Sequence, residues 1–156
     1  MNIRRITKKD NLDLKRVYFD SIISINQSTY NNEQKQAWSS QAWNNRNFKR
    51  SIIKGKGWLI EEKDTIVAFA SRYPNNKIAL FYCLGEYQRK GYGTKLVNKL
   101  EKEAKKEGLE SLFTEASLIS YKLFLKLNWE IIRKEKIIIN NIFFERYKMI
   151  KNYYNK

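Results

Sequence analysis

The chain has 156 residues, of which 42% are hydrophobic and 30% charged, and its formal net charge at pH 7 is +15. This length and apolar content predict one compact domain with its own core. With no histidine and one cysteine, the chain cannot form a Ser-His-Asp or Cys-His catalytic site, a zinc site rich in these residues, or a disulfide framework. No apolar run approaches the roughly 18 residues of a membrane span, and the amino terminus lacks a signal peptide, so we expect a cytoplasmic protein with no membrane partner.

Hydrophobic periodicity and turn residues divide the chain into strands and helices. In chain order we predict a strand at 3–6, a helix from about 10 to 25, one or two short helices within 30–48, strands at 57–62, 65–73 and 78–84, a helix at 95–107, a strand at 109–115, a helix at 118–127, and strands at 129–139 and 142–150. Asp10 is the expected helix cap, and the run 78–84, apolar on both faces, is the expected central strand. This order predicts an α+β fold with a mixed, mostly antiparallel sheet flanked by helices.

The domain is expected to cover residues 1–150, with a short tail at 151–156. Tight turns are expected at Lys63-Asp64 and at Asn140-Asn141, because Asn and Asp tolerate the positive φ that such turns need. The hairpin that contains the second turn is a plausible pairing edge, so both a monomer and a homodimer are compatible with the sequence.

The large positive charge has two interpretations, an ordinary charged surface or a nucleic-acid footprint. Lysine and glutamate alternate between Lys99 and Glu107, which is typical of the solvent-facing side of a helix. Because the charges are scattered along the chain, we favour the charged surface, with a nucleic-acid partner as the alternative.

The most informative segment lies between the central strand and the following helix, and reads Gln88-Arg89-Lys90-Gly91-Tyr92-Gly93-Thr94. The first turn of a helix has backbone N–H groups without a partner and the positive end of the helix dipole, so it attracts anions. The two glycines allow an anion to approach the backbone closely. The spacing fits neither a P-loop, because Thr94-Lys95 follows the second glycine, nor a dinucleotide fingerprint, because Leu96 replaces the third glycine. The segment therefore predicts a phosphate or pyrophosphate site of another kind.

The remaining pattern, Gln-x-x-Gly-x-Gly, resembles the acetyl-CoA loop of the GNAT (Gcn5-related) N-acetyltransferase superfamily. A second block, from Glu115 to Trp129, is similar to the A-x-x-F-Y-x-K-x-G-F helix of many members, and the order of elements matches the GNAT order along the whole chain. The segment from Tyr30 to Trp38 resembles one in a bacterial branch of small GNAT proteins. This resemblance implies the acyl-CoA N-acyltransferase fold and an acetyl-CoA-dependent transfer of acetyl to a primary amine of a small molecule or peptide, without a metal.

The resemblance also implies a place for acetyl-CoA, in a cleft where the strand 78–84 splays from the strand 111–115. Backbone groups at Phe81 and Cys83, with Tyr82 between them, would pair with the pantetheine arm. Residues 88–94 would hold the pyrophosphate, and Phe124 would lie beside the cofactor. Arg89 and Lys90 have either a role on the 3′-phosphate or that of a solvated turn, while Tyr92 is either a lid or a surface aromatic. Cys83 is expected to pack as a small hydrophobe.

The expected catalytic residues depart from the family pattern. The usual acid is a tyrosine, and Phe124 stands in its place. Tyr121 lies one helical turn earlier on the same face and is the candidate that protonates the leaving thiolate; a thiolate can also leave unaided, since a free thiol titrates near about 8.5. Glu115 is the first candidate for the general base, with Glu86 and a chain of water molecules as alternatives.

The acceptor is expected to bind against the amino-terminal half. Tyr30 and Trp38 would wall the acceptor site, with Glu33 and Trp43 in the same segment, and a core role for the aromatic rings is the alternative. Because of the charge and the substitution at Phe124, a second function is a GNAT-fold module that binds CoA or RNA with weak or no catalysis.

Overall fold

The computed structural model describes residues 1–154, without the side chains of residues 43 and 44. Its elements in chain order are β1 (Asn2–Arg5), η1 (Lys8–Asp10), α1 (Asn11–Ile23), α2 (Asn32–Ser39), α3 (Gln41–Asn44), α4 (Arg46–Ile53), β2 (Lys56–Glu62), β3 (Thr65–Arg72), β4 (Lys77–Cys83), η2 (Gly85–Tyr87), α5 (Tyr92–Lys106), β5 (Ser111–Ala116), α6 (Tyr121–Lys126), β6 (Glu130–Ile139) and β7 (Ile142–Asn152).

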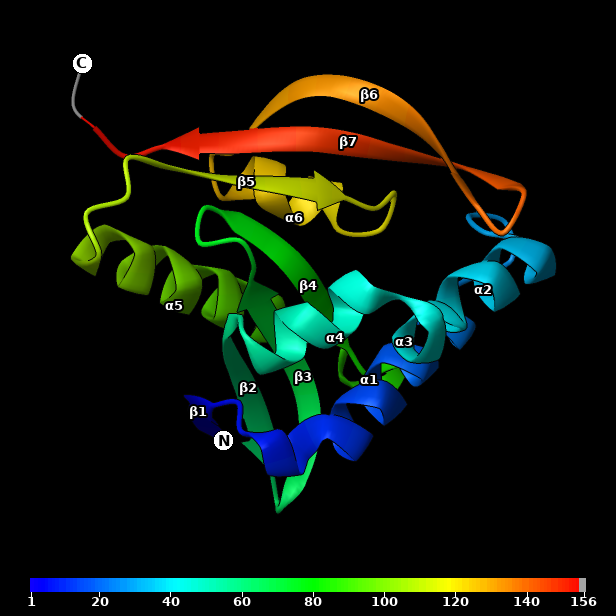
Figure 1. Cartoon of the computed structure of the whole chain (residues 1–156), viewed down its shortest axis with the longest axis horizontal. Helices are drawn as coiled ribbons and strands as arrows, with labels where there is room; N and C mark the ends of the chain where they lie inside the picture. The colour runs from blue at the N-terminus through cyan, green and yellow to red at the C-terminus, as the bar shows by residue number, and fades with distance from the viewer. Residues whose placement is uncertain (155–156) are drawn as a thin grey trace.

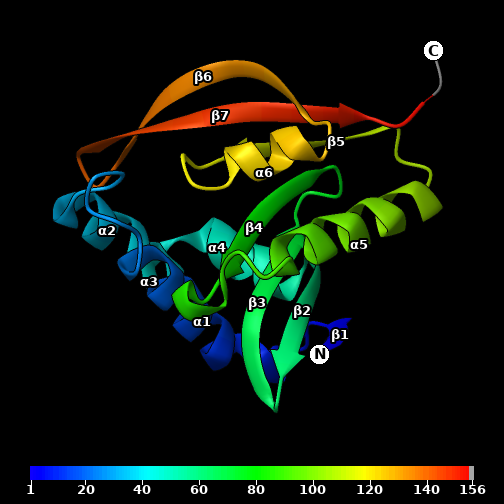
Figure 2. The same ribbon diagram turned by 180° about the vertical axis from the view of Figure 1, so that it is seen from behind.

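The strands form a seven-stranded sheet in the order β1-β2-β3-β4-β5-β7-β6. Every neighbouring pair is antiparallel except β4 and β5, which are parallel. Helices α1 and α4 lie in front of the sheet in Figure 1, whereas α5 and α6 lie on the other face and come to the front in Figure 2. Because helices cover both faces, β3 is buried along nearly its whole length. The predicted mixed sheet with β4 at its centre is confirmed.

The two parallel strands stay together over only a short distance. Lys77 pairs with Phe113 and Ile78 pairs with Thr114, and beyond these residues the strands diverge. The Thr114 hydroxyl donates a hydrogen bond of 2.9 Å to the Ile78 carbonyl at the last point of contact. Figure 1 shows β4 running downward, away from β5. We call this divergence the β4–β5 opening.

Several local predictions need correction. Three short helices, rather than one or two, begin within residues 30–48. Asp10 precedes α1, but its carboxylate does not cap that helix; it accepts from the Thr7 N–H at 2.7 Å and pairs with Arg4. Strand β7 continues to Asn152, so residues 151 and 152 belong to the sheet rather than to a tail. The Tyr153 hydroxyl, which donates to Glu101 at 2.9 Å, ties the end of the described chain to α5.

The two predicted hairpin turns are confirmed. Lys63 and Asp64 have φ values of 48° and 66°, and Asn140 and Asn141 have values of 49° and 64°. Two consecutive residues with positive φ match the right-handed twist of the flanking strands. The second turn brings the tip of the β6–β7 hairpin over α2, where the Gln34 amide donates to the Phe143 carbonyl at 3.0 Å. No helix in the described part of the chain is long and apolar enough to cross a membrane.

Candidate active site

A row of backbone groups on β4 faces the β4–β5 opening. The N–H of Leu84 donates to Val67 on β3 at 2.8 Å. Because backbone groups alternate in direction along a strand, those of Cys83 and Phe81 face away from β3. A register shift opposite Ser71 and Arg72 reverses the alternation, and the Ile78 carbonyl therefore faces β5 instead. The bulge thus lets β4 pair with β5 at one end and present an unpaired edge at the other.

The segment 88–94 leads from this edge into α5. Gly91 precedes the helix with φ of 85°, a left-handed conformation that glycine adopts without strain. The first intrahelical bond runs from the Lys95 N–H to the Gly91 carbonyl at 3.1 Å, so the N–H groups of residues 92–94 have no helical partner. Gln88, Arg89 and Lys90 are exposed. The sequence prediction of an anion-binding first turn agrees with this geometry.

Gly93 is needed for close packing rather than for its φ. A Cβ at this position would lie 2.8 Å from Leu123 Cδ2 and 3.0 Å from Phe81 Cζ. The first turn of α5 therefore rests directly on β4 and α6. The glycine segment thus packs against the helix of the Glu115–Trp129 block.

Tyr92 is tied to the β2–β3 hairpin. Its hydroxyl donates to Glu62 Oε1 at 2.6 Å, and this carboxylate raises the pKa of Tyr92 to about 12. The ring therefore points toward β2 and β3 in this structure, which does not match a lid over the opening. The Lys90 ammonium lies 5.0 Å from the centre of the Tyr87 ring.

Two aromatic pairs join α6 to the sheet. Phe124 is 1% exposed and makes edge-to-face contacts with Phe81 at 5.4 Å and with Trp129 at 4.9 Å between ring centroids. Its ring belongs to the core, directly behind the exposed edge of β4. Tyr121 is partly buried, and its ring lies on Tyr147 at 4.4 Å with an interplanar angle of 31°.

A cavity of about 350 Å³ lies on the face covered by α1–α4, and both β4 and β5 contribute to its lining. We call it the aromatic cleft, because its wall includes the rings of Tyr18, Tyr30, Trp38, Phe48, Tyr82 and Phe144. The Tyr18 hydroxyl donates to the Trp38 carbonyl at 2.5 Å, and the Tyr30 hydroxyl accepts from the Leu118 N–H at 2.9 Å. Burial raises the pKa of Tyr82 to about 12. The Tyr18 bond joins α1 to α2, and the Tyr30 bond joins the segment between these helices to the loop before α6.

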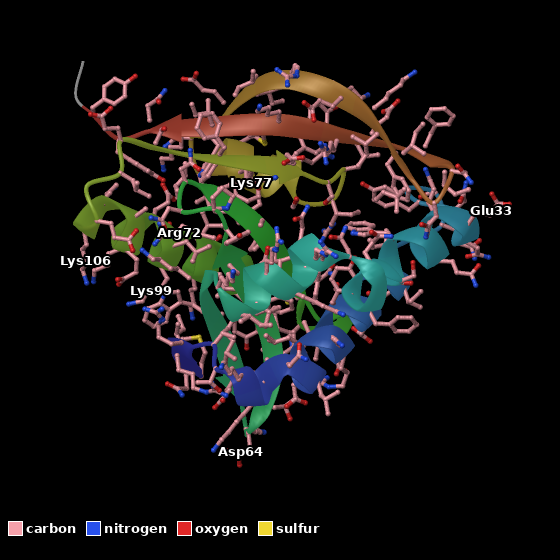
Figure 3. All side chains as sticks on the ribbon, viewed as in Figure 1. Glu33, Asp64, Arg72, Lys77, Lys99 and Lys106 are labelled. Atoms are coloured by element: carbon pink, nitrogen blue, oxygen red, sulfur yellow. The ribbon has the colours of Figure 1, made fainter. Side chains whose placement is uncertain are left out.

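Glu115 stands where the cleft meets the β4–β5 opening. Lys77 pairs with its Oε1 and Arg146 pairs with its Oε2, and Arg146 also contacts Glu135 at 2.9 Å. Figure 3 shows Lys77 near the middle of the molecule, beside β4 and β5. Both carboxylate oxygens of Glu115 are therefore engaged, and each keeps a second lone pair that can accept a proton.

The structure separates the remaining candidates. Glu33 lines a different hollow with Gln27, and Figure 3 places it at the outer end of α2, away from Lys77. Glu86 is exposed within η2. Cys83 is only partly buried, and burial raises its thiol pKa to about 11. The side chain of Trp43 lies outside the described residues. Within the described part of the chain, no cluster of three potential metal ligands occurs.

Sequence reasoning missed Lys77 and Arg146 as part of the site. They lie far apart in the chain, and only the β5–β7 and β4–β5 registers bring both to Glu115. It also missed Glu62 as the partner of Tyr92. A carboxylate at the end of a predicted strand carries no signal for such a distant partner.

Comparisons with known proteins agree with this geometry. The sequence profile of the acetyltransferase (GNAT) domain matches residues 26–151. No curated protein matches the sequence. A GCN5-related N-acetyltransferase from Rhodopseudomonas palustris superposes with a TM-score of 0.91 at 24% identity, over 97% of this chain and 95% of that chain.

Two further solved structures contain a ligand. The PaiA N-acetyltransferase from Thermoplasma acidophilum, in complex with coenzyme A, gives a TM-score of 0.75 at 18% identity, over 97% of this chain and 98% of that chain. YncA from Salmonella typhimurium, with its cofactor acetyl-CoA, gives a TM-score of 0.68 at 18% identity, over 97% of this chain and 93% of that chain.

The fold and the site define an acyltransferase of the GNAT type. Because the profile covers most of the sequence, the chain belongs to the GNAT acetyltransferase family. The family and the fold that the Gln88–Thr94 segment suggested are therefore confirmed.

Proposed function

We propose that the protein is an acetyl-CoA-dependent N-acetyltransferase that acts on a primary amine of a small molecule or peptide by direct attack on the thioester. The observation that carries this proposal is the unpaired edge of β4, which leads straight into the first turn of α5. The CoA and acetyl-CoA found in the relatives from Thermoplasma and Salmonella support it. We further propose that one domain, from residue 1 to the end of β7, carries the activity in the cytoplasm, as a monomer or homodimer.

The described residues fit the cofactor. The backbone groups of Phe81 and Cys83, on either side of Tyr82, are directed to pair with the amides of the pantetheine arm, as an added strand would. The N–H groups at the start of α5 are suited to the pyrophosphate, and Arg89 and Lys90 are exposed beside them. Phe124 supports this arm from behind through Phe81.

Acetyl-CoA supplies an activated acetyl thioester. On the protein side, the Phe81 N–H is the proposed donor to the oxygen that becomes negative during attack. Glu115 is the proposed acceptor of the amine proton, because it lines the cleft at the β4–β5 opening. Tyr121, on α6 with its ring packed on Tyr147, is the proposed donor of a proton to the departing thiolate.

Thermal unfolding with CoA tests the cofactor site. A ligand at 100 times its Kd stabilises the native state by about 2.7 kcal/mol, which raises the Tm of a domain of this size by roughly 5–11 °C. Pantetheine, which lacks the pyrophosphate and the 3′-phosphate, is the matched control and should stabilise much less. An unchanged Tm at millimolar CoA would contradict the proposal. Thiol release from acetyl-CoA with a panel of amines then tests catalysis.

A further inference from the structure

The face of the sheet that lines the aromatic cleft carries more cations than carboxylates. Residues directly opposite one another in an antiparallel pair share a face. Glu115 is opposite Lys148, Arg146 is opposite Glu135, and Arg133 is opposite Lys148. Ile150 is opposite both Phe113 and Glu130, which adds Glu130 to the face. With Lys77 from β4, four cations therefore share this face with three carboxylates.

Ion pairs engage two of the three carboxylates and three of the four cations. Glu115 is held by Lys77 and Arg146, and Glu135 is held by Arg146 and, at 2.9 Å, by Arg133. Lys148 makes no ion pair with any described residue. Glu145, which also lines the cleft, is neutralised by Lys134 at 2.7 Å. Among the residues that line the cleft, Glu145 is therefore already paired, and two cations, Lys77 and Arg146, surround the one carboxylate, Glu115, that a ligand can reach.

The other end of the cleft is apolar. Tyr30, Trp38 and Phe144 form a cluster of rings whose centroids lie 5.3–6.4 Å apart. A volume of about 350 Å³ is at the small end of the range for ligand pockets. The cleft thus combines one aromatic wall with one ionic end, in a space that holds a single small molecule.

We propose that the acceptor is a small amine that also carries a carboxylate and an aromatic or large apolar group, as an aromatic amino acid does. This inference rests on the proposed function and specifies its substrate class. The substrate carboxylate binds Lys77 and Arg146, which frees one oxygen of Glu115 to receive the ammonium group. The apolar group lies against Tyr30 and Trp38. Because the substrate brings one charge of each sign, the ion-pair network exchanges partners without leaving a charge unpaired.

Matched acceptors test the inference. Thiol release should show kcat/KM at least about tenfold higher for L-phenylalanine than for 2-phenylethylamine, which lacks only the carboxylate, since a charge-assisted hydrogen bond is worth a factor of this order. Phenylalanine amide should resemble 2-phenylethylamine. Lys77→Gln should reduce the preference to about threefold or less. Lys136→Gln removes an exposed lysine from the other face of β6 and should leave the preference unchanged.

A binding measurement separates this inference from the proposed function. N-acetyl-L-phenylalanine and N-acetyl-2-phenylethylamine are titrated by calorimetry into the wild type and Lys77→Gln. Tighter binding of the carboxylate compound, weakened in Lys77→Gln, supports the inference even if no amine is acetylated. A lack of acetylation would then count against catalysis alone. Equal affinity for the two acetylated compounds, equal kcat/KM for the two amines, or no binding of either acetylated compound would overturn the proposed substrate class. Thiol release with other amines would still test the acetyl transfer.

Discussion

Glu115→Gln separates a catalytic carboxylate from one that only holds the sheet together. The change keeps the shape of the side chain but removes the charge between Lys77 and Arg146. The three side chains are 23–36% exposed, so water screens both pairs, and each pair contributes about 0–1 kcal/mol. Because the two cations then face each other, we expect the free energy of unfolding to fall by about 1–2 kcal/mol and the Tm by ~3–6 °C.

The kinetic effect should be much larger if Glu115 takes the proton. Loss of a general base lowers kcat/KM by about 100-fold or more, and thiol release from acetyl-CoA measures this directly. Glu135→Gln is the matched control, because Glu135 also bridges two cations but does not line the cleft. We expect a similar loss of stability and kcat/KM within about threefold of the wild type. If Glu115→Gln shows the loss of stability with the same small kinetic effect, the base is another group.

Three further changes test other parts of the structure. Gly91→Ala should lower the free energy of unfolding by about 1–2 kcal/mol, because φ is 85° there. Gly91→Asn should lower this free energy by less. Equal losses for the two variants in urea unfolding would rule out backbone strain as the cause. Tyr121→Phe should lower kcat without raising the KM for acetyl-CoA, and unchanged turnover between pH 6 and 9 would reject the acid role. Arg4 holds the pKa of Asp10 below its usual range, so the stability from this pair is present above about pH 4 and is lost as the pH falls through the folded-state value. Asp10→Asn should therefore destabilise at pH 7 and flatten the acid limb of the stability curve; an unaltered acid limb would show that Asp10 contributes nothing to it.

Local signals were sufficient for much of the fold. Short-range chemistry decides a turn such as Asn140-Asn141, because the residues that need positive φ are the ones that tolerate it. Asp10 shows the limit of such signals. Its position before a helix predicts a cap, but Arg4 and the Thr7 N–H, which pack beside it in the fold, take its carboxylate instead.

The sequence by itself determined the glycine turn at the start of α5 and the family to which the chain belongs. Gly91 and Gly93 act through their own backbone and the helix that starts beside them, so their spacing alone is informative. The tertiary structure alone decided what stands around Glu115. Its partners Lys77 and Arg146 come from two other strands, and a one-residue change of register would turn either side chain to the opposite face. The surroundings of Glu115 therefore depend on long-range strand pairing, which no local pattern in the sequence encodes.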